Sequence, residues 1–523
     1  MAGNRQPLRP RSARMDTTPF WMTNVEARRF PRLGGDLDVE VLIVGGGICG
    51  ITAAYLLARA GRKVALIEKE NIGCGQTGHT TAHLTQVTDT LLSELVRTFG
   101  RDHAQATWDA GAFAVAQIEE HIREEGIDCE LRKVPGYLCA AREAQGQKDA
   151  DELKEEARLA AELGFDASFV AATPVFGTPG VRFPNQAKFH PLKYLHALAQ
   201  RAAAAGAQIF EETPAEEFAS APRSVKANGW IIRYDRLVLA THVPLQGPHN
   251  LVHGPLLQTK LAAYSTYALG ARLPAGTLPE ALFWDTADPY RYLRVERRDG
   301  HDYAIFGGQD HKTGQEENTE TCFHRLGDEL RALCPEAKVE QRWTGQVMES
   351  VDGLPYYGET ADREFVATGF AGNGMTFGTL GGYMARDWVL GLTNPWRDLF
   401  SVERKKLSSA WDYLSENKDF PYYLVKGRLG AAEASDVQEV ARGQGKIVQL
   451  GGKKCAVYRD PGGAVTTLSA VCPHMGCIVG WNRADKTWDC PCHGSRFHAT
   501  GEVLGGPAES ALEPVSARGD AGH

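Results

Sequence analysis

Apolar residues early in the chain form two strand-length runs separated by a helix-length segment. Val39 to Val44 and Lys63 to Ile67 are short runs of the kind that form buried strands. The segment from Ile48 to about Ala60 is rich in small and apolar residues, which favours a buried helix. The order strand, helix, strand predicts a βαβ unit within an α/β sheet.

Two other periodicities follow. Apolar residues three and four positions apart predict helices, and short apolar runs bounded by turn residues predict strands. Helices are expected at Leu91 to Phe99, Phe113 to Ile122, Leu153 to Leu163 and Pro191 to Ala205, and strands at Glu130 to Lys133, Gly136 to Cys139, Ile231 to Ala240, Leu261 to Tyr267, Tyr290 to Val295 and Tyr303 to Gly307. We interpret the strand-rich part as an α+β domain inserted into a Rossmann-like α/β domain.

The turn after the first strand carries the glycines of a dinucleotide-binding unit. Gly45 allows a tight turn, Gly47 lets the backbone approach a pyrophosphate, and Gly50 lets the helix pack closely on the strand. The N-terminus of that helix then faces the phosphates with unpaired N–H groups. Glu68 ends the second strand, where a carboxylate can accept both hydroxyls of an adenosine ribose. We therefore expect a nucleotide cofactor.

Length, charge and cysteine usage limit the possible functions. The 523 residues suffice for two or three domains, and 57 basic against 65 acidic residues give a formal charge of −8, so we expect no nucleic-acid partner. We expect no transmembrane segment, and a flexible N-terminal segment over residues 1–35. Seven of the eleven cysteines are scattered without ligand spacing, which indicates buried thiols of a cytoplasmic protein.

Three further motifs resemble a known family. The loop after Glu68 contains Gln-Thr-Gly-His at residues 76–79, residues 352–358 read Asp-Gly-Leu-Pro-Tyr-Tyr-Gly, and residues 369–378 read Gly-Phe-Ala-Gly-Asn-Gly-Met-Thr-Phe-Gly before a helix. With the first glycine turn, residues 36–395 resemble the FAD-dependent oxidoreductases of the D-amino-acid oxidase and glycine oxidase group. The resemblance implies FAD-binding parts at about 36–95, 185–245 and 346–395, with a substrate domain between them.

The resemblance also implies FAD contacts beyond the first turn. The glycine-rich start of the last helix would stabilise negative charge on the reduced flavin. The implied contacts are Thr77, Gly78, His79, Thr241, Gly369, Gly372, Asn373, Gly374 and Met375. His242 departs from the residues common in similar flavoproteins, and is either a polar group near the flavin or a helix-cap substitute.

Four residues are candidates for a catalytic role. In some relatives that oxidise dimethylglycine or sarcosine, a histidine in a similar loop is bonded covalently to the flavin, so His79 is either such a link or a simple polar contact. Asp310, His311 and Lys312 lie in a predicted polar break of the substrate domain, and in this group such a loop is near the flavin ring. The alternative for these three is a solvated turn.

The remaining four cysteines lie near the C-terminus with two histidines. Cys472-Pro-His474-Met-Gly-Cys477 is followed, after twelve residues, by Cys490-Pro-Cys492-His493-Gly-Ser495. Two Cys-plus-His pairs on two loops suit a Rieske [2Fe–2S] centre, in which two thiolates hold one iron and two imidazoles hold the other. A zinc site is the alternative.

By resemblance to Rieske proteins, the pattern assigns each of these residues a role. The implied cluster ligands are Cys472, His474, Cys490 and His493, and the implied disulfide joins Cys477 to Cys492. High-potential relatives present a serine and a tyrosine hydroxyl to the cluster sulfurs. Here Ser495 is kept and Phe497 stands at the tyrosine position, so we predict a lower reduction potential.

Together the two sites predict a flavin dehydrogenase. A small-molecule substrate, an amine or amino acid by resemblance, gives a hydride to FAD, and the flavin passes electrons to the Rieske [2Fe–2S] cluster and on to an unidentified external acceptor. The Rieske domain, small and all-β, is expected over residues 434–523, behind a linker over 396–433 with one amphipathic helix around Leu407 to Leu414.

Two alternatives remain for the function. One is a flavin reductase that supplies a partner oxygenase from NAD(P)H, which is disfavoured because only one nucleotide-binding βαβ unit is visible in the sequence. The other is a redox sensor that does not turn over.

Overall fold

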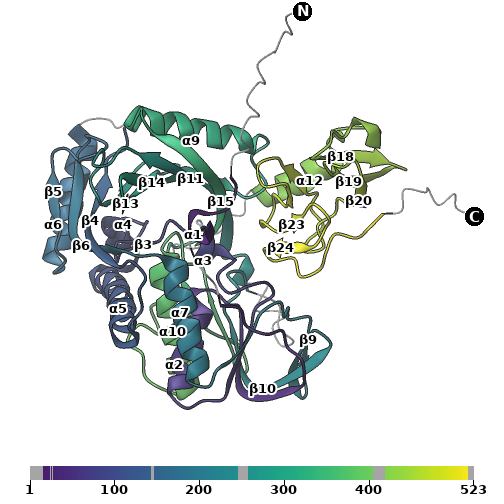
Figure 1. Cartoon of the computed structure of the whole chain (residues 1–523), viewed down its shortest axis with the longest axis horizontal. Coiled ribbons are helices and arrows are strands. Elements are labelled where there is room, and N and C mark those ends of the chain that lie inside the picture. The colour runs from purple at the N-terminus through teal and green to yellow at the C-terminus, as the bar shows by residue number, and fades with distance from the viewer. Residues whose placement is uncertain are drawn as a thin grey trace, which may run out of the picture.

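The computed structural model of the chain describes residues 16–23, 25, 28–142, 147–244, 257–404 and 419–515. Three bodies make up the molecule. An α/β unit lies at the bottom of the view in Figure 1, a large mixed sheet stands above it, and a C-terminal domain lies beside both.

The α/β unit is built on a mainly parallel sheet with β1 near its centre. Its parallel strands lie in the order β17 (Glu364–Thr368), β10 (Trp230–Leu239), β1 (Leu37–Val44), β2 (Val64–Ile67) and β7 (Gln208–Phe210). Strand β16 (Tyr356–Ala361) adds an antiparallel edge, and β8 (Glu217–Ser220) and β9 (Arg223–Ala227) form a hairpin beside β10. Residues 41–44 of β1 are all buried, as a central parallel strand requires.

Three helices cover one face of this sheet. Helix α2 (Ile48–Arg59) packs against both α10 (Gly374–Leu390) and α7 (Pro191–Ala204). Helix α7 begins after His190, whose ring nitrogen accepts a hydrogen bond from the Lys193 backbone N–H at 3.2 Å. The βαβ unit and the helix at Pro191 are therefore confirmed, with ends that shift by one or two residues.

The upper sheet is mixed and belongs to the inserted substrate domain. Its strands run in the order β15 (Lys338–Ser350), β11 (Leu261–Leu273), β14 (His301–Lys312), β13 (Tyr292–Arg298), β12 (Leu282–Asp285), β4 (Arg132–Cys139), β6 (Gly180–Lys188) and β3 (His83–Leu84), with β5 (Ser168–Val170) on β6. Helix α9 (Thr319–Leu333) packs on β11 and β14. At the other end of the sheet lie α4 (Leu92–Phe99), α5 (Arg101–Glu125) and α6 (Gln147–Glu162), which confirms the three predicted helices there.

Two strand predictions in this sheet need correction. The two short strands expected at 130–139 are one strand, β4, with a register irregularity between Val134 and Gly136. The polar break expected after residue 307 is wrong, because β14 continues to Lys312. The pairing of β14 with β11 shifts register between Ser265 and Tyr267, and Gln309 has φ of 61°, so the polar run forms a bulge that redirects side chains without ending the strand.

The N-terminal expectation is also wrong for part of its range. Helix α1 (Phe20–Thr23) follows a β-bridge between Asp16 and Gln341, and Trp21 is fully buried. The Trp21 indole N–H donates to the Thr80 carbonyl at 2.7 Å, and the Arg294 guanidinium lies over the Trp21 ring. Burial of the Phe20 and Trp21 side chains stabilises this segment against the rest of the fold, although its composition is polar. Residues 1–15 lie outside the described residues.

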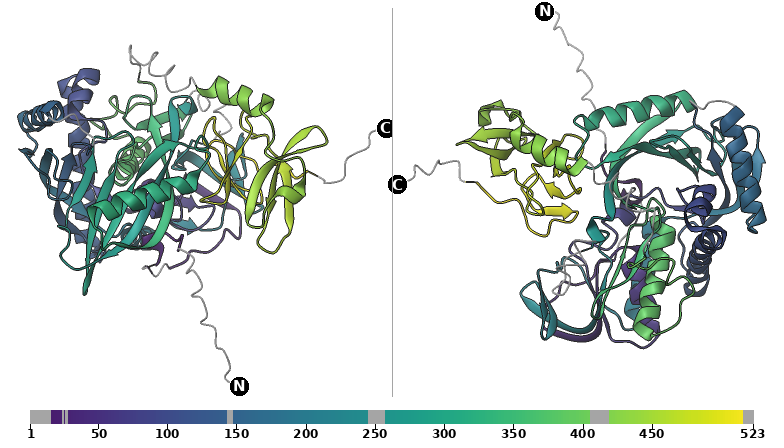
Figure 2. Two further views of the ribbon diagram at one scale, coloured as in Figure 1. Left: turned by 90° about the horizontal axis from the view of Figure 1, so that it is seen from above. Right: turned by 180° about the vertical axis from the view of Figure 1, so that it is seen from behind.

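The C-terminal domain consists of two small antiparallel sheets. One contains β18 (Gln444–Leu450), β19 (Lys453–Arg459) and β20 (Val465–Ser469), and the other contains β21 (Gly480–Asn482), β22 (Thr487–Asp489), β23 (Arg496–His498) and β24 (Val503–Gly505). Helix α12 (Asp419–Leu429) precedes them within the expected linker (Figure 2). The amphipathic helix expected at residues 407–414 lies outside the described residues. In the part of the chain that the structure describes, no helix has the length and apolar character needed to span a bilayer.

Candidate functional site

A cavity of about 510 Å³ lies between the α/β unit and the mixed sheet. Loops of the α/β unit form its floor, strands of the mixed sheet form its roof, and residues 503–509 of the C-terminal domain close one side. Its size is typical of a site for a small molecule or cofactor. The expected nucleotide site and the expected substrate site therefore share one cavity.

The first glycine turn forms part of the cavity floor. Gly45 has φ of 112°, and a Cβ there would lie 2.4 Å from the Ala240 carbonyl oxygen. A Cβ on Gly50 would lie 2.0 Å from the Gly45 carbonyl oxygen, so neither position accepts a side chain. Gly45 and Gly47 line the cavity, whereas Gly50 lies behind the turn and lets α2 start there. This cradle fits the pyrophosphate that the sequence predicts.

Glu68 is held at the end of β2, on the cavity wall. One carboxylate oxygen accepts a hydrogen bond from the Gly46 N–H at 2.7 Å, and the other accepts one from the Glu70 N–H at 3.0 Å. A carboxylate carries about four lone-pair sites, so two such bonds leave capacity for ribose hydroxyls. The structure therefore orients Glu68 as the nucleotide prediction requires.

The short helix α3 (Gln76–His79) brings two of the three expected loop contacts to the cavity. The Thr77 hydroxyl accepts a hydrogen bond from the Ile48 N–H at 3.1 Å, which ties this loop to the start of α2. His79 lines the cavity with its ring held by the Gly75 carbonyl at 3.0 Å, and burial lowers the pKa of the imidazole. Gly78 is not in the wall; it packs against Gly73. The covalent link at His79 stays a prediction.

The last two expected FAD loops lie across the floor. Thr241, Gly372, Asn373, Gly374 and Met375 all line the cavity, whereas Gly369 packs beside Leu261 and does not. The Asn373 side-chain oxygen accepts from the Asp89 N–H at 3.3 Å, and its amide donates to the Val87 carbonyl at 3.2 Å. This amide fixes the loop before α10 against the segment that carries Asp89.

His242 lines the cavity as well. Its φ of 68° is uncommon for a residue with a side chain, and burial lowers the pKa of its imidazole to about 4, although a hydrogen bond to the Gln346 backbone opposes that shift. The ring is therefore neutral at pH 7. Of the two interpretations left open by the sequence, the structure favours a polar group in the cofactor cavity.

The roof of the cavity, on the substrate side, is made of aromatic residues and acids that no sequence motif singled out. Trp284, Tyr290, Tyr292 and Asp89 line it, and the Tyr290 hydroxyl donates to Asp89 at 3.2 Å. Trp284 and Tyr292 come from strands β12 and β13, Tyr290 from the loop between them, and Asp89 from a distant loop, so no motif links them. Among the residues predicted at this end, only Asp310 is connected to this wall, through a hydrogen bond from Thr266.

Asp310 lies directly behind this wall. It accepts a hydrogen bond from the Thr266 hydroxyl at 2.5 Å, and the Tyr292 hydroxyl lies 2.6 Å from the same Thr266 oxygen. Since the Thr266 hydroxyl has one proton, which goes to Asp310, Tyr292 is the donor to Thr266. Two hydroxyl groups in series therefore point their protons toward the Asp310 carboxylate.

Burial raises the pKa of both acids. Asp89 is open to the cavity and otherwise enclosed by protein, and its pKa rises to about 7, opposed by the Tyr290 hydrogen bond. Burial also raises the pKa of Asp310 to about 7, and the nearby charge of Asp89 adds to the rise. Both carboxyl groups can therefore change charge near neutral pH.

His311 and Lys312 do not lie where the sequence analysis expected. The His311 ring stacks on Tyr267 with centroids 5.6 Å apart, and Tyr267 packs on Phe323 of α9. Successive side chains of a strand point to opposite faces, so His311 faces α9 while Asp310 faces the cavity. Lys312 is not among the residues that line the cavity. Neither residue is therefore placed to contact a substrate in the cavity.

In the C-terminal domain, the four expected cluster ligands converge from two loops. The Cys472 and Cys490 thiols are hydrogen-bonded to each other, and the His474 and His493 rings lie with centroids 5.0 Å apart. The Ser495 side chain reaches Cys472, and its oxygen accepts from the Ala508 N–H at 3.1 Å. Two thiols and two imidazoles on facing loops fit the donor set of a Rieske centre.

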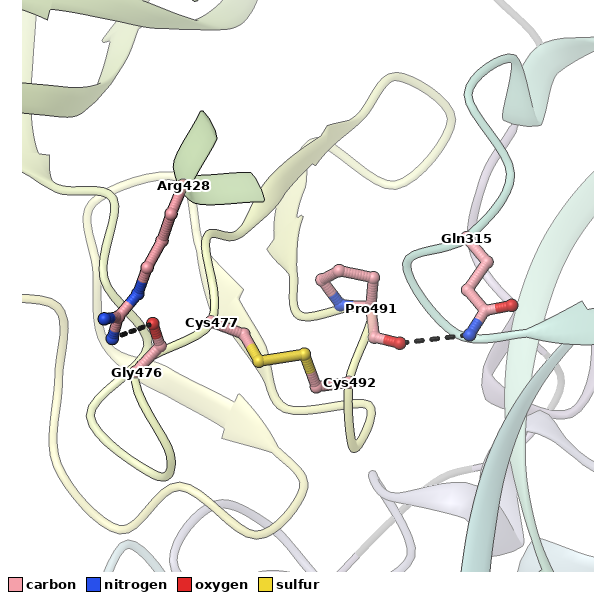
Figure 3. Close-up of a disulfide and its surroundings, with 6 residues drawn as sticks. All are labelled: Gln315, Arg428, Gly476, Cys477, Pro491 and Cys492. Carbon is pink, nitrogen blue, oxygen red and sulfur yellow. Dashed lines mark hydrogen bonds between the residues drawn. A yellow bond between two sulfur atoms is a disulfide. The ribbon is translucent and has the colours of Figure 1, made fainter. Parts of the chain in front are cut away.

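A disulfide joins the two ligand loops, as Figure 3 shows. It links Cys477 to Cys492, the pairing that the Rieske resemblance implies. In the described residues the sulfurs of Cys477, Cys490 and Cys492 also lie within 4.8 Å of one another, but two of them are spent in the disulfide and offer no thiolate to zinc. Arg428 of α12 donates to the Gly476 carbonyl at 3.2 Å, which holds one of these loops.

The C-terminal domain docks on the cavity through its cluster loops. The Gln258 side-chain oxygen accepts a hydrogen bond from His474 Nε2 at 3.1 Å, and the Gln258 amide N–H donates to the Pro244 carbonyl at 3.0 Å, one residue after the cavity wall. Gln346 lines the cavity and donates to the Gly494 carbonyl at 2.9 Å, next to His493. Each glutamine therefore connects a cavity loop to a ligand loop.

Further hydrogen bonds surround this contact. The Lys69 ammonium donates to the Leu504 carbonyl at 2.6 Å, and the Gln315 amide donates to the Pro491 carbonyl at 3.1 Å (Figure 3). Thr319 and Thr344 of the substrate domain bond to Asn482 and Asp485, at 2.9 Å and 2.6 Å. This interface could not be predicted from the sequence, because its residues carry no shared motif.

The chain is similar to known proteins over both parts. A family described as FAD dependent oxidoreductase matches residues 40–388, and one described as Rieske [2Fe-2S] domain matches residues 431–516. The chain is 32% identical over 506 residues to YhfW of Bacillus subtilis (strain 168), whose name gives it as a Rieske 2Fe-2S iron-sulfur protein; the match covers 95% of this chain and 97% of YhfW.

Two solved structures share the fold of the larger part. The glycine oxidase from Geobacillus kaustophilus superposes with a TM-score of 0.59 at 21% identity, over 71% of this chain and 99% of its own. The L-proline dehydrogenase from P. horikoshii gives a TM-score of 0.57 at 18% identity, over 71% of this chain and 98% of its own.

Proposed function

This chain belongs to the FAD-dependent oxidoreductase family and ends in a Rieske [2Fe–2S] domain, and on that premise we propose that it is an amine or amino-acid dehydrogenase. It binds FAD and a [2Fe–2S] cluster. In the proposed reaction the substrate loses a hydride from carbon and a proton from nitrogen and becomes an imine, which water hydrolyses. The two electrons then leave one at a time through the cluster to an external one-electron acceptor.

One observation carries the proposal: the Rieske domain forms part of the wall of the FAD cavity. Residues 503–506, 508 and 509 line that cavity, and Gln258 and Gln346 connect its loops to the ligand loops. A cluster domain that served a separate reaction would gain nothing from this contact. Its placement favours direct electron transfer inside one chain.

The assignments of individual residues are part of the proposal. Gly45, Gly47 and Gly50 form the pyrophosphate cradle, Glu68 takes the ribose, and Thr77, His79, Thr241 and residues 372–375 surround the flavin. Cys472, His474, Cys490 and His493 hold the cluster. When bound, FAD supplies a two-electron acceptor and the cluster a one-electron carrier.

The chain's own residues have distinct tasks in this reaction. The carboxylate of Asp89, on the substrate side of the cavity, can hold the proton that the substrate nitrogen loses. Trp284, Tyr290 and Tyr292 form an aromatic wall that orients the substrate and limits the access of water to it. The N-terminus of α10 faces the cavity and favours negative charge there.

A spectroscopic experiment tests the proposal. Purified protein is mixed under argon with a panel of amines and amino acids, and the flavin and Rieske absorption bands are followed separately. We expect at least one compound to bleach the flavin first and the cluster second. NADH is the control: rapid bleaching by NADH, with none by the panel, would favour the flavin reductase, and no bleaching by either would favour the redox sensor.

We also propose a cytoplasmic location. The seven scattered cysteines are free thiols in the structure, six of them buried, and the one disulfide lies beside the cluster. Fractionation of cells that express the chain checks this.

A further inference from the structure

The described residues on the substrate side of the FAD cavity include an acid and no lysine or arginine. Asp89 lines it, and Asp310 lies behind Thr266 in the same wall. Among the described residues that line the cavity, Lys69 is the only lysine or arginine, and it donates to Leu504 beside Glu68, at the nucleotide end. A substrate carboxylate would therefore find no cationic partner at this wall.

Two arginines near this wall, Arg291 and Arg294, form ion pairs with acids of the protein. Arg291 pairs with Asp285 at 3.2 Å and with Glu329 at 2.7 Å, on the side of β13 that faces α9. Arg294 pairs with Glu296 at 2.5 Å and donates to the carbonyls of Ala82 and Phe189. Each of these guanidinium groups is held by at least one carboxylate, so a ligand could bind to either only by displacing an existing ion pair.

The backbone opposite Asp89 also excludes a cationic side chain. Gly372 has φ of 73°, and a Cβ built on it would lie 1.8 Å from the Asp89 carboxylate oxygen. Asp89 thus occupies the space in which a side chain at position 372 would begin. The loop residues that line the cavity carry no charged side chain, and its polar groups there are the backbone and the Asn373 amide.

Aromatic rings complete the wall. Trp284, Tyr290 and Tyr292 line the cavity, and the two tyrosine rings lie with centroids 5.4 Å apart at an angle of 46°. Tilted electron-rich rings beside a carboxylate attract organic ammonium groups by cation–π interaction and by charge. This combination of groups does not suit an amino-acid carboxylate.

We propose that the substrate is an organic amine that enters as a cation and carries no carboxylate next to its amino group. This inference rests on the proposed function and narrows it to one of its two substrate classes. The ammonium group lies against Asp89 with the aromatic rings around its carbon substituents, and Asp310 adds to the negative potential through Thr266 and Tyr292. Amino acids are disfavoured because their carboxylate would face Asp89.

Binding of ligands that cannot react tests the charge preference without turnover. Tetramethylammonium and trimethylacetate have similar size and shape and opposite charge, and calorimetry on the oxidised, FAD-loaded chain gives the affinity of each. We expect tetramethylammonium to bind at least about tenfold more tightly. Equal affinities, tighter binding of trimethylacetate, or no binding of tetramethylammonium would each overturn the proposal.

Matched variants locate the effect. Asp89→Asn keeps the shape of the side chain and removes its charge, and should weaken tetramethylammonium binding by about tenfold. Asp299→Asn makes the same change at an exposed turn of the same sheet and should leave the affinity unchanged. Unaltered affinity in Asp89→Asn, with FAD content equal to that of the parent, would contradict the assignment.

A substrate pair separates failure of this inference from failure of the proposed function. Benzylamine and phenylglycine share the reacting carbon and ring, and differ by the carboxylate. We expect benzylamine to reduce the flavin faster. Faster reduction by phenylglycine would sink this inference and leave the dehydrogenase proposal standing, whereas reduction by no amine or amino acid would sink the dehydrogenase while the calorimetric preference could still hold.

Discussion

The two redox sites of this chain are built in opposite ways. The flavin cavity is shaped by backbone and by loops that come from several distant parts of the chain, with Glu68 as its fixed carboxylate. The proposed cluster site consists of four side chains within residues 472–493, on two loops joined by a disulfide. At a site built from many segments, replacement of one residue should reduce cofactor affinity only partly. At a site with four essential ligands, loss of one ligand should abolish cofactor binding.

The largest expected effect is therefore at a cluster ligand. Cys490→Ser should abolish the cluster and leave FAD bound, because two thiolates are needed for one iron. Acid-labile sulfide, the EPR signal and flavin absorbance measure the two cofactors separately. Cys455→Ser is the matched control, a buried free thiol of the same domain, and should keep the cluster. A cluster retained in Cys490→Ser would remove the contrast between the sites.

On the flavin side, a fall in pH should weaken ligand binding by about tenfold for each of the two acids that loses its charge. Burial raises the pKa of Asp89 and of Asp310 to about 7, so both lose negative charge as the pH falls below 7. Since tetramethylammonium keeps its charge at every pH, its affinity should fall with decreasing pH below 7 and level off above it. Calorimetry from pH 5 to pH 9 measures this.

The groups around the two acids do not compete over this range. Burial lowers the pKa of His83 to about 3, and burial raises the pKa of both Tyr290 and Tyr292, so all three stay neutral. Asp288 adds to the rise at Asp310. An affinity that stays flat between pH 5 and pH 9 would show that these acids do not contact the ligand.

A substitution in the glycine turn that forms the pyrophosphate cradle should reduce FAD affinity only partly. Gly50→Ala places a methyl group 2.0 Å from the Gly45 carbonyl, and relief of that clash costs about 1–3 kcal/mol. We expect FAD affinity to fall by about thirtyfold, measured by flavin release during dilution. Gly35→Ala is the control, because nothing lies within 4 Å of the place where its new methyl group would stand. Complete loss of FAD with an unfolded chain would instead mark Gly50 as a folding residue.

A smaller effect is expected where the two sites meet. Gln258→Leu removes the hydrogen bond between Gln258 and His474, and loss of about 1 kcal/mol should slow transfer from flavin to cluster about fivefold. Stopped-flow absorbance at the cluster band gives the rate. Gln449→Leu, on exposed β18, should change nothing. Identical rates in the two variants would mean that this contact plays no part in docking.

The smallest effect is a shift of potential. Phe497 is fully buried in β23, and Phe497→Tyr would restore a hydroxyl at the position that the Rieske resemblance assigns to the sulfur-bonding tyrosine. One hydrogen bond of about 1 kcal/mol corresponds to about 40 mV for a one-electron couple, and it should raise the potential. Protein-film voltammetry measures the shift, and Ser495→Ala should move the potential in the opposite direction.

Local patterns allowed much of this architecture to be predicted. The strand, glycine turn and helix between Leu37 and Arg59 are contiguous, so periodicity and turn chemistry suffice to place them. The cluster ligands were equally accessible, because each Cys-plus-His pair lies within one short loop. In both cases the residues that act together are close in sequence.

Other features depended on tertiary structure. Asp89 and Tyr290 are 201 positions apart in the sequence and meet only in the tertiary structure, so no spacing pattern indicates them. The composition of the polar run at Asp310 predicts a turn, but pairing with β11 keeps the run in a strand. Because this run is a strand, the His311 side chain lies on the face that packs on α9, opposite to Asp310. The docking surface of the Rieske domain was beyond prediction for the same reason.

The central claim is that the flavin and the cluster exchange electrons within one chain. Its most direct test is rapid-freeze EPR of the full-length protein after anaerobic mixing with a reducing amine. The account predicts that the reduced Rieske signal grows as the flavin bleaches, at a rate independent of protein concentration. A cluster that stays oxidised beside a fully reduced flavin, or a rate proportional to protein concentration, would contradict it.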